Sequence, residues 1–137
     1  MDIAWDDWRT RKFTTNIGLI TSNGTYGHNI EAVEWTHHIS YAPSLITVHI
    51  HFIDATNKNI KKTKEFGVNL CAADQNIVSS IAGGSSGKDV DKIKVLKELG
   101  YEFYKAKKID VLMLKGAAMN AECKVIDMKD LGDHTMF

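Results

Sequence analysis

The chain has 137 residues, of which 44% are hydrophobic and 25% charged, a composition typical of one globular domain. Its 17 lysines and arginines balance its 17 aspartates and glutamates, so it lacks the basic excess needed to bind nucleic acid or an anionic membrane surface. We therefore expect a single domain over residues 1–137, with neither nucleic acid nor a membrane as a partner.

The first residues, MDIAWDDWRTRKF, lack the apolar core of a signal peptide, and no apolar run approaches the roughly 20 residues of a membrane span. Cys71 and Cys123 lie far apart without a CxxC spacing, each in an apolar stretch where a free cysteine behaves as a small hydrophobic residue. A disulfide between them stays possible on number alone. The interpretation we favour is a reduced, cytoplasmic protein.

Strand patterns dominate the first half of the chain. Residues 16–21 (NIGLIT) are apolar and β-branched, the turn Ser22-Asn23-Gly24 follows, and residues 26–35 return from it. Residues 45–52 alternate, which places Leu45, Thr47, His49 and His51 on one face of a strand. The only proline, Pro43, precedes this strand, where its missing N–H does no harm.

The second half mixes helices with further strands. A helix is predicted over residues 57–64 with Thr56 as its N-cap, followed by a strand over residues 66–72. Asp74 then caps a short helix to residue 81, and a flexible loop covers residues 83–87. Asp89 opens a helix that ends at Gly100, and its apolar stripe is Val90, Ile93, Leu96 and Leu99. Two more strands are expected over residues 109–114 and 118–128, and the whole pattern suggests a small β-barrel with helices between strands.

Residues 29–45, NIEAVEWTHHISYAPSL, combine polar, aromatic and apolar side chains just before an apolar strand. A tryptophan beside asparagine, serine and threonine, supported by a rigid strand, suits a flat and polar ring. Small-ligand sites have this character, with apolar walls and a few placed hydrogen-bonding groups.

Taken together, five segments resemble the flavin reductase-like family of FMN-binding split-barrel proteins. They are residues 15–21; residues 29–45 with the Trp35…Ser40…Pro43 spacing; FGVN at 66–69; SGKDVDK at 86–92; and ECKV at 122–125 running into GDHT at 132–135. The resemblance implies a mainly β fold with short helices, a split barrel that binds FMN, or FAD, at a homodimer interface. It also implies NAD(P)H-dependent reduction of flavin or of ferric iron, in which the flavin performs the electron transfer and the protein orients it. The alternative is a split-barrel protein that binds flavin without turnover or has lost it.

The resemblance places Asn29, Ala32, Trp35 and Thr36 along the isoalloxazine ring. Val33 and Ser40 of the same segment join this set of cofactor-binding candidates. Trp35 would supply a wall for the ring, while Asn29 and Thr36 would supply hydrogen-bond donors. The competing interpretation of Trp35 is a core anchor at the end of a strand.

A phosphate is expected at the start of the helix at residues 56–58, where Thr56, Asn57 and Lys58 stand. The family often has a basic residue just before this threonine, whereas this chain has Asp54, whose repulsion a nearby lysine would have to offset. The competing interpretation is an ordinary N-cap. Lys88 stands where the family commonly has arginine, and it keeps the positive charge but lacks the bidentate guanidinium fork. One interpretation is that Lys88 contacts flavin or nucleotide. The competing interpretation is that it lies in a loop before a capped helix.

His134 matches the family's GDH motif, which approaches the flavin. An imidazole there could donate to a flavin oxygen and stabilise the negative charge of reduced flavin, so His134 is the candidate catalytic residue. The competing interpretation is a structural histidine at a strand start.

A metal site is the rival use of the histidines, since His49 and His51 share a strand face and His37 and His38 are near in sequence. No carboxylate or cysteine stands at a supporting spacing, so we predict no metal.

The chain stops at Phe137, just inside an expected strand, where family domains continue. Either it is a fragment or it is a C-terminally shortened member whose barrel is completed differently, and an open edge there would favour dimerisation.

Overall fold

The computed structural model describes Ala4, Asp7 and residues 15–137, so most of the N-terminal stretch examined for a signal peptide lies outside the described residues. The strands are β1 (Gly18–Ser22), β2 (Asn29–Val33), β3 (Thr36–Tyr41), β4 (Ser44–His51), β5 (Glu65–Leu70), β6 (Phe103–Lys105), β7 (Leu112–Leu114), β8 (Met119–Lys124), β9 (Lys129–Leu131) and β10 (His134–Met136). The helices are α1 (Ala55–Thr63), α2 (Asn76–Gly84) and α3 (Lys92–Glu98). No helix among the described residues is long and apolar enough to cross a membrane.

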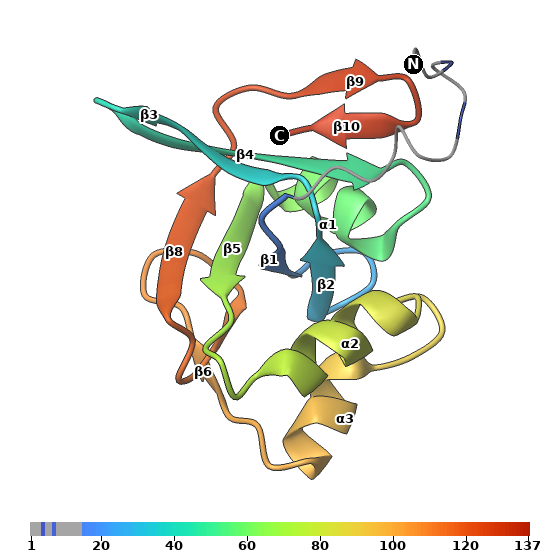
Figure 1. Ribbon diagram of the computed structural model, residues 1–137, viewed down its shortest axis with the longest axis vertical. Helices are drawn as coiled ribbons and strands as arrows, with labels where there is room; N and C mark the ends of the chain where they lie inside the picture. The colour runs from blue at the N-terminus through green and yellow to red at the C-terminus, as the bar shows by residue number, and fades with distance from the viewer. Residues whose placement is uncertain (1–3, 5–6, 8–14) are drawn as a thin grey trace.

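Two antiparallel four-stranded sheets form the body of the protein. The first has the order β2-β1-β5-β8 and the second the order β3-β4-β10-β9, while β6 and β7 pair separately. Figure 1 shows the second sheet running across the upper end of the first, with α2 and α3 below. The mainly β fold of the split-barrel type with short helices, predicted from the sequence, is confirmed.

The core follows from strand alternation in β1. Leu19 and Ile20 are both fully buried, but as neighbours on a strand they point to opposite faces of the first sheet. Ile20 packs between the sheets with Val48, Ile50, Phe66, Val68 and Phe137. Leu19 packs on the helical side with Ile30, Val78, Ile93, Leu96 and Leu114. Burial of each such side chain stabilises the fold by about 1.5–3 kcal/mol. Because β1 places one side chain in each half of the core, it is the strand that joins the two halves.

Strand β3 was not predicted from the sequence, because it carries little of the alternation that a half-buried strand shows. It is the edge strand of the second sheet, and His38, Ile39 and Tyr41 on it are exposed. Its partner β4 begins at Ser44, and its buried residues are Thr47, Val48 and Ile50.

The helix starts differ from the predicted caps. The N-cap of α1 is Asp54, because Thr56 lies inside the helix and its side chain is fully buried. The N-cap of α2 is Gln75 rather than Asp74, and this helix extends through Gly84, into the segment predicted as a loop.

Helix α3 also starts later than predicted. It begins after Asp91, whose carboxylate accepts a hydrogen bond from the Lys94 backbone N–H at 2.9 Å. Of the predicted stripe, Ile93 and Leu96 are buried, whereas Val90 and Leu99 lie outside the helix and are exposed. Asp89 is therefore part of the preceding turn.

The C-terminal strands are shorter and more numerous than predicted. Three-residue strands such as β6, β9 and β10 are too short to show a period in the sequence. After β10 the chain continues to pair with the sheet, since Phe137 and Val48 exchange backbone hydrogen bonds of 2.9 and 3.0 Å. The described chain therefore ends within the second sheet, next to β4.

Candidate functional site

Three hollows lie in a row along β2, the edge strand of the first sheet. The tryptophan pocket, about 200 Å³, is lined by Glu31, Ala32, Val33, Glu34, Trp35, His49, His51, Asp54 and His134. The acidic pocket, about 310 Å³, is lined by Glu31, Ala32, Asp54, Ala55, Ala82, Gly83, Gly84, Ser85, Ser86, Gly87 and Lys92. The lysine pocket, about 520 Å³, is lined by Tyr26, Gly27, His28, Gly87, Lys88, Asp89, Val90, Asp91, Ile93, Lys94, Lys97 and Leu112.

Neighbouring pockets share lining residues, and we call the three pockets together the groove. The tryptophan and acidic pockets share Glu31, Ala32 and Asp54, while the acidic and lysine pockets share Gly87. At about 3.3 Å per residue, the five residues of β2 alone span about 13 Å.

Aromatic rings line the tryptophan pocket. The indole of Trp35 is 42% exposed, and its ring lies 4.7 Å from that of His134 at an angle of 46°. His49 meets the indole edge-on at 6.3 Å. The backbone also fixes this loop, because the Trp35 carbonyl accepts a hydrogen bond of 3.0 Å from the His49 N–H. The pocket thus presents a partly exposed aromatic wall next to an imidazole.

Asp133 lies between two histidines of this pocket. His134 and His51 are directly paired on β10 and β4, so their side chains share one face of the sheet. The Asp133 carboxylate lies 2.6 Å from Nδ1 of His134 and 3.9 Å from Nε2 of His51. The hydrogen bond from His134 lowers the pKa of Asp133. Because the carboxylate only accepts hydrogen bonds, Nδ1 of His134 carries the proton of this hydrogen bond.

Two carboxylates, Glu31 from β2 and Asp54 at the start of α1, face the acidic pocket. Burial raises the pKa of Glu31 to about 7; the Thr56 hydroxyl opposes the rise by hydrogen bonding, and the charge of Asp54 adds to it. Glu31 therefore changes charge near neutral pH. Sequence reasoning missed this residue, although an acid within an otherwise apolar strand was the available signal.

Lys92 interacts electrostatically with both acids, and it is 2% exposed. Its ammonium donates to the carbonyls of Ala82 at 2.8 Å and Ser85 at 3.1 Å, which lie at the C-terminal end of α2 and need donors. Burial lowers the pKa of Lys92, and the two acids oppose this effect. The sequence analysis included Lys92 in the SGKDVDK segment but assigned no role to it. Its ammonium satisfies carbonyls at the end of α2, so no free cation among the described residues lines the acidic pocket.

Asn29 and Thr56 are tied together beneath the groove. The Asn29 amide donates to the Thr56 hydroxyl at 2.8 Å, and the two residues are 2% and 0% exposed. A Cβ on Gly87 would clash with the side-chain amide of Asn29, so a larger residue there would require that buried amide to shift. These residues shape the floor of the groove from below.

The lysine pocket lies at the other end, where the loop at residues 86–91 meets α3. The Lys88 ammonium lies 5.7 Å from the centre of the Tyr26 ring, within the range of a cation–π contact. Lys94 and Lys97 add two more exposed ammonium groups from α3. This end of the groove is therefore its most basic part.

The structure brings four of the candidate site residues together in the tryptophan pocket, namely Ala32, Val33, Trp35 and His134. Lys88 lies in the lysine pocket. Thr36 is buried and its hydroxyl donates to the Val33 carbonyl at 3.0 Å, and Ser40 lies on β3, outside the three pockets. Ligand contacts by Thr36 and Ser40 therefore stay predictions from the sequence.

The candidate phosphate residues do not face the groove. Thr56 and Asn57 are fully buried, and the Asn57 amide donates to the Ile50 carbonyl at 3.0 Å. Lys58 is exposed but lines none of the three pockets. The tryptophan pocket thus presents a partly exposed indole, whereas the groove beside α1 presents carboxylates where a phosphate was expected.

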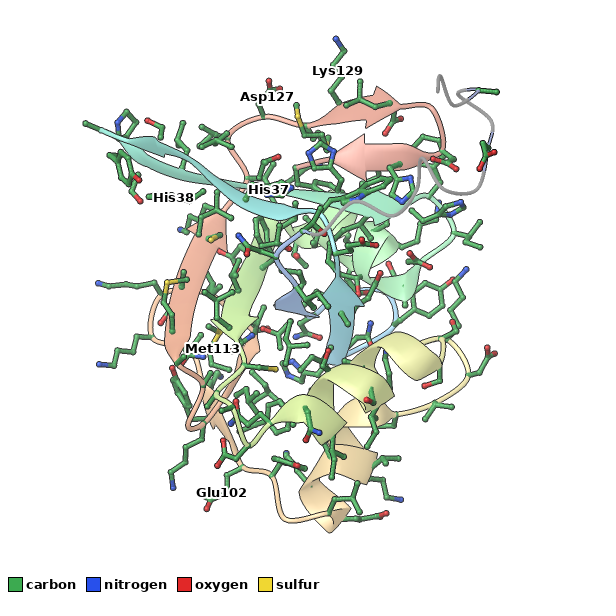
Figure 2. The ribbon with its side chains drawn as sticks, viewed as in Figure 1. His37, His38, Glu102, Met113, Asp127 and Lys129 are labelled. Carbon is green, nitrogen blue, oxygen red and sulfur yellow. The ribbon has the colours of Figure 1, made fainter. Side chains whose placement is uncertain are left out.

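In the described part of the chain, no group of three or more histidine, cysteine, aspartate or glutamate side chains is placed to hold a metal ion. His37 and His38 lie on β3 (Figure 2), and His38 hydrogen-bonds the Ser44 hydroxyl at 3.1 Å. Cys71 and Cys123 are free thiols. The histidines of the tryptophan pocket contact Trp35 or Asp133.

Comparison with known proteins identifies a family and two archaeal relatives. The profile described as "Flavin reductase like domain" matches residues 10–137. An uncharacterized protein of Pyrococcus abyssi is 34% identical over 119 residues, which cover 87% of this chain and 66% of the relative. An uncharacterized protein of Archaeoglobus fulgidus is 30% identical over 119 residues, with 87% and 65% covered. The chain thus spans just under two thirds of the length of these relatives.

Solved structures share the fold at low sequence identity. A flavoredoxin from Methanosarcina acetivorans matches with a TM-score of 0.85 and 20% identity, covering 100% of this chain and 69% of its own. An FMN-binding protein from Thermus thermophilus matches with a TM-score of 0.83 and 19% identity, and the match covers 100% of this chain and 72% of the Thermus chain. An NADH:FAD oxidoreductase from Streptomyces globisporus matches with a TM-score of 0.84 and 17% identity, covering 100% and 82%.

Proposed function

The chain belongs to the flavin reductase-like domain family, and from this premise we propose that it binds a flavin in the groove along β2 and transfers electrons to it from NAD(P)H. The reduced flavin, FMN or FAD, would then pass electrons to free flavin or to ferric iron. A bound flavin supplies the hydride and electron chemistry, and the protein supplies orientation and charge.

One observation carries the proposal, which is the exposed indole of Trp35 beside the imidazole of His134 in a pocket that a flat ring can enter. Trp35 would cover one part of the ring by stacking. His134, held by Asp133 through Nδ1, has Nε2 available to donate to an oxygen or nitrogen at the ring edge when it is protonated. That donation would stabilise the negative charge of reduced flavin.

A visible spectrum tests the binding step first. The purified protein, with and without added FMN or FAD, is passed through a desalting column and its absorbance is recorded. Flavin bands that stay with the protein support the proposal, and so does quenching of flavin fluorescence on titration with the protein. A colourless protein that quenches neither flavin would contradict it.

Turnover separates the enzyme from the second candidate function, a flavin-binding protein without appreciable activity. The second candidate is favoured by Asp54, which stands where a phosphate-binding cation was expected, and by Glu31, a second carboxylate in the same pocket. NADH and NADPH oxidation is followed with excess FMN, FAD or ferric citrate as acceptor. Oxidation that depends on both protein and acceptor supports the enzyme, while flavin binding without oxidation supports the second candidate.

We also propose a cytoplasmic homodimer with flavin at or near its interface. The dimer, as distinct from the position of the flavin, is supported by an exposed apolar surface outside the groove, which we call the hairpin face. It includes Ile39 (59% exposed), Tyr41 (89%) and Ile126 (78%). Ile39 and Ile126 line a hollow of about 530 Å³ that is bounded by β4, β8 and Phe137. Exposed apolar patches of this kind commonly mark protein–protein contacts.

A further inference from the structure

We propose that Glu31 holds a proton when the tryptophan pocket is occupied, so that flavin binding takes up a proton from solution near neutral pH. The inference rests on the proposed function, because it takes a flavin as the ligand of that pocket. It assigns to Glu31 a role in setting how tightly the ligand binds, and it makes that affinity depend on pH.

Glu31 lies where two pockets meet. Its side chain lines both the tryptophan pocket and the acidic pocket. Alternation along β2 places it on the same face of the strand as Asn29 and Val33, which are 2% and 4% exposed. The carboxyl is thus largely enclosed by protein before a ligand binds, and a ring in the tryptophan pocket would exclude more water from it.

The hydrogen bonds of Glu31 accommodate one proton shared with Asp54. Asp54, the N-cap of α1, lines the same two pockets and forms a side-chain hydrogen bond with Glu31 that favours the neutral Glu31 carboxyl. Two carboxyl groups can hydrogen-bond each other only when one of them is protonated. The Thr56 hydroxyl accepts a hydrogen bond from the Asn29 amide at 2.8 Å and donates its own proton to Glu31, which favours the charged form. Glu31 therefore has a hydrogen-bond partner in either charge state.

Other ionisable groups lie on the elements that pack against β2 and in the tryptophan pocket. Lys92 of α3 favours the charged form of Glu31, but its ammonium is committed to carbonyls at the end of α2. Strand β1 and helix α2 have no ionisable side chain. The lysines of α1 and the remaining ionisable side chains of α3 are exposed or paired elsewhere, and they are Lys58, Lys61, Lys62, Lys94, Lys97 and Glu98. The tryptophan pocket adds Glu34, His49, His51 and His134.

Ligand binding acts on this balance in one direction. Burial already raises the pKa of Glu31 to about 7, so near neutral pH about half of the free protein has Glu31 protonated. A ring that excludes water raises the cost of the charged form further, and a phosphate would add a second negative charge near the two carboxyl groups. Both changes favour the protonated carboxyl. The ligand and the proton therefore strengthen each other's binding.

Calorimetry counts the protons that accompany binding. The protein is titrated with FMN and with riboflavin at pH 7.5, in two buffers of different ionisation enthalpy. The variants are Glu31→Gln, which resembles the neutral carboxyl in shape and charge, and the control Glu98→Gln at an exposed position on α3. Wild type and control should take up about half a proton more than Glu31→Gln, because the histidines and the FMN phosphate contribute equally in all three proteins.

Two further measurements follow the same proton. If binding raises the pKa of Glu31 by about one unit, the affinity of the wild type should fall by about five- to tenfold between pH 6 and pH 9, relative to Glu31→Gln. Carboxyl-carbon NMR of glutamate-labelled wild type needs no variant. One side-chain resonance should titrate near pH 7 in the free protein and at a higher pH with flavin bound.

The inference and the proposed function fail separately. Equal proton counts for wild type, Glu31→Gln and Glu98→Gln, or an NMR midpoint that bound flavin leaves unmoved, would overturn the role of Glu31 while the proposed function stands. Absence of flavin binding at every pH would overturn both.

Discussion

The side chains of Trp35 and His134, which come from opposite ends of the chain, meet with their rings 4.7 Å apart at an angle of 46°. Trp35 follows β2 and His134 begins β10, and the strand between them in space is β4, whose His49 and His51 contact the two rings. This arrangement makes the site depend on the C-terminal strand. Trp35 and His134 are the residues proposed to hold a flavin ring, and His49 and His51 support them by contact.

Asp133 is predicted to act as a positioning residue for His134. Asp133→Ala removes the acceptor at 2.6 Å from Nδ1, so flavin reduction should slow by about tenfold while flavin affinity changes by less than about threefold. Asp133→Asn, which keeps an acceptor oxygen, should restore part of the rate. Stopped-flow reduction by NADH across pH 5–9 measures this. Equal rates for all three proteins, with superimposable pH profiles, would show that Asp133 has no such role.

Glu31 should make stability depend on pH. Its pKa in the folded protein, about 7, lies above the ordinary value of 4.5, so its neutral form is favoured by folding. The resulting stabilisation is fully present below pH 4.5 and is lost as the pH rises through 7. It amounts to at most about 3 kcal/mol.

Urea unfolding at pH 5 and pH 8 tests this prediction on the wild type, on Glu31→Gln and on the exposed-residue control Glu98→Gln. Wild type and control should lose stability between pH 5 and pH 8 relative to Glu31→Gln. Parallel pH profiles for all three proteins would contradict it.

Asp54 should weaken the binding of phosphate-bearing flavins selectively. Asp54→Asn removes one negative charge from the acidic pocket, so FMN should bind about threefold more tightly while riboflavin, which has no phosphate, is unchanged. The gain should shrink at high salt. Asp127→Asn, an exposed charge far from the groove (Figure 2), is the control. The same change for FMN and riboflavin would place the phosphate away from Asp54.

The hairpin face should carry the dimer contact. Ile39→Asp places a charge on an apolar patch, and since burial of an isoleucine contributes about 1.5–3 kcal/mol, the dimer should weaken by more than about tenfold. Light scattering coupled to size exclusion gives the mass directly. Tyr104→Asp, at an exposed aromatic position on β6, should leave the mass unchanged. A wild-type protein that elutes as a monomer at all concentrations would contradict the proposed dimer.

The sequence predicted the elements whose pattern is local and repeated. The alternation in residues 45–52 predicted β4, and the stripe of Ile93 and Leu96 predicted the buried side of α3. It could not predict β3, whose side chains are mostly exposed, or the three-residue strands, which are too short for a period. It also could not predict the N-caps, because the burial of Thr56 under Asn29 depends on tertiary packing.

The residues predicted to hold the flavin ring stay predictions, but the structure brings several of them together. Trp35 and His134 were selected through their motifs and do lie in one pocket. The phosphate residues were selected from a helix start, but whether Thr56 and Asn57 face solvent depends on how α1 packs against β2 and β4. Glu31 and Lys92 escaped notice because their importance comes from burial, which no local pattern in the chain reveals.

The central claim, that a flavin ring binds against Trp35 and His134, is tested most directly by titrating flavin fluorescence with the wild type, Trp35→Ala, His134→Ala and the control Tyr104→Ala. The wild type and the control should bind FMN or FAD equally well. Trp35→Ala should raise the dissociation constant by about tenfold, as expected for loss of an aromatic stacking contact, and His134→Ala should lower the affinity or the rate of reduction. Binding curves and reduction rates that coincide for all four proteins would contradict the account.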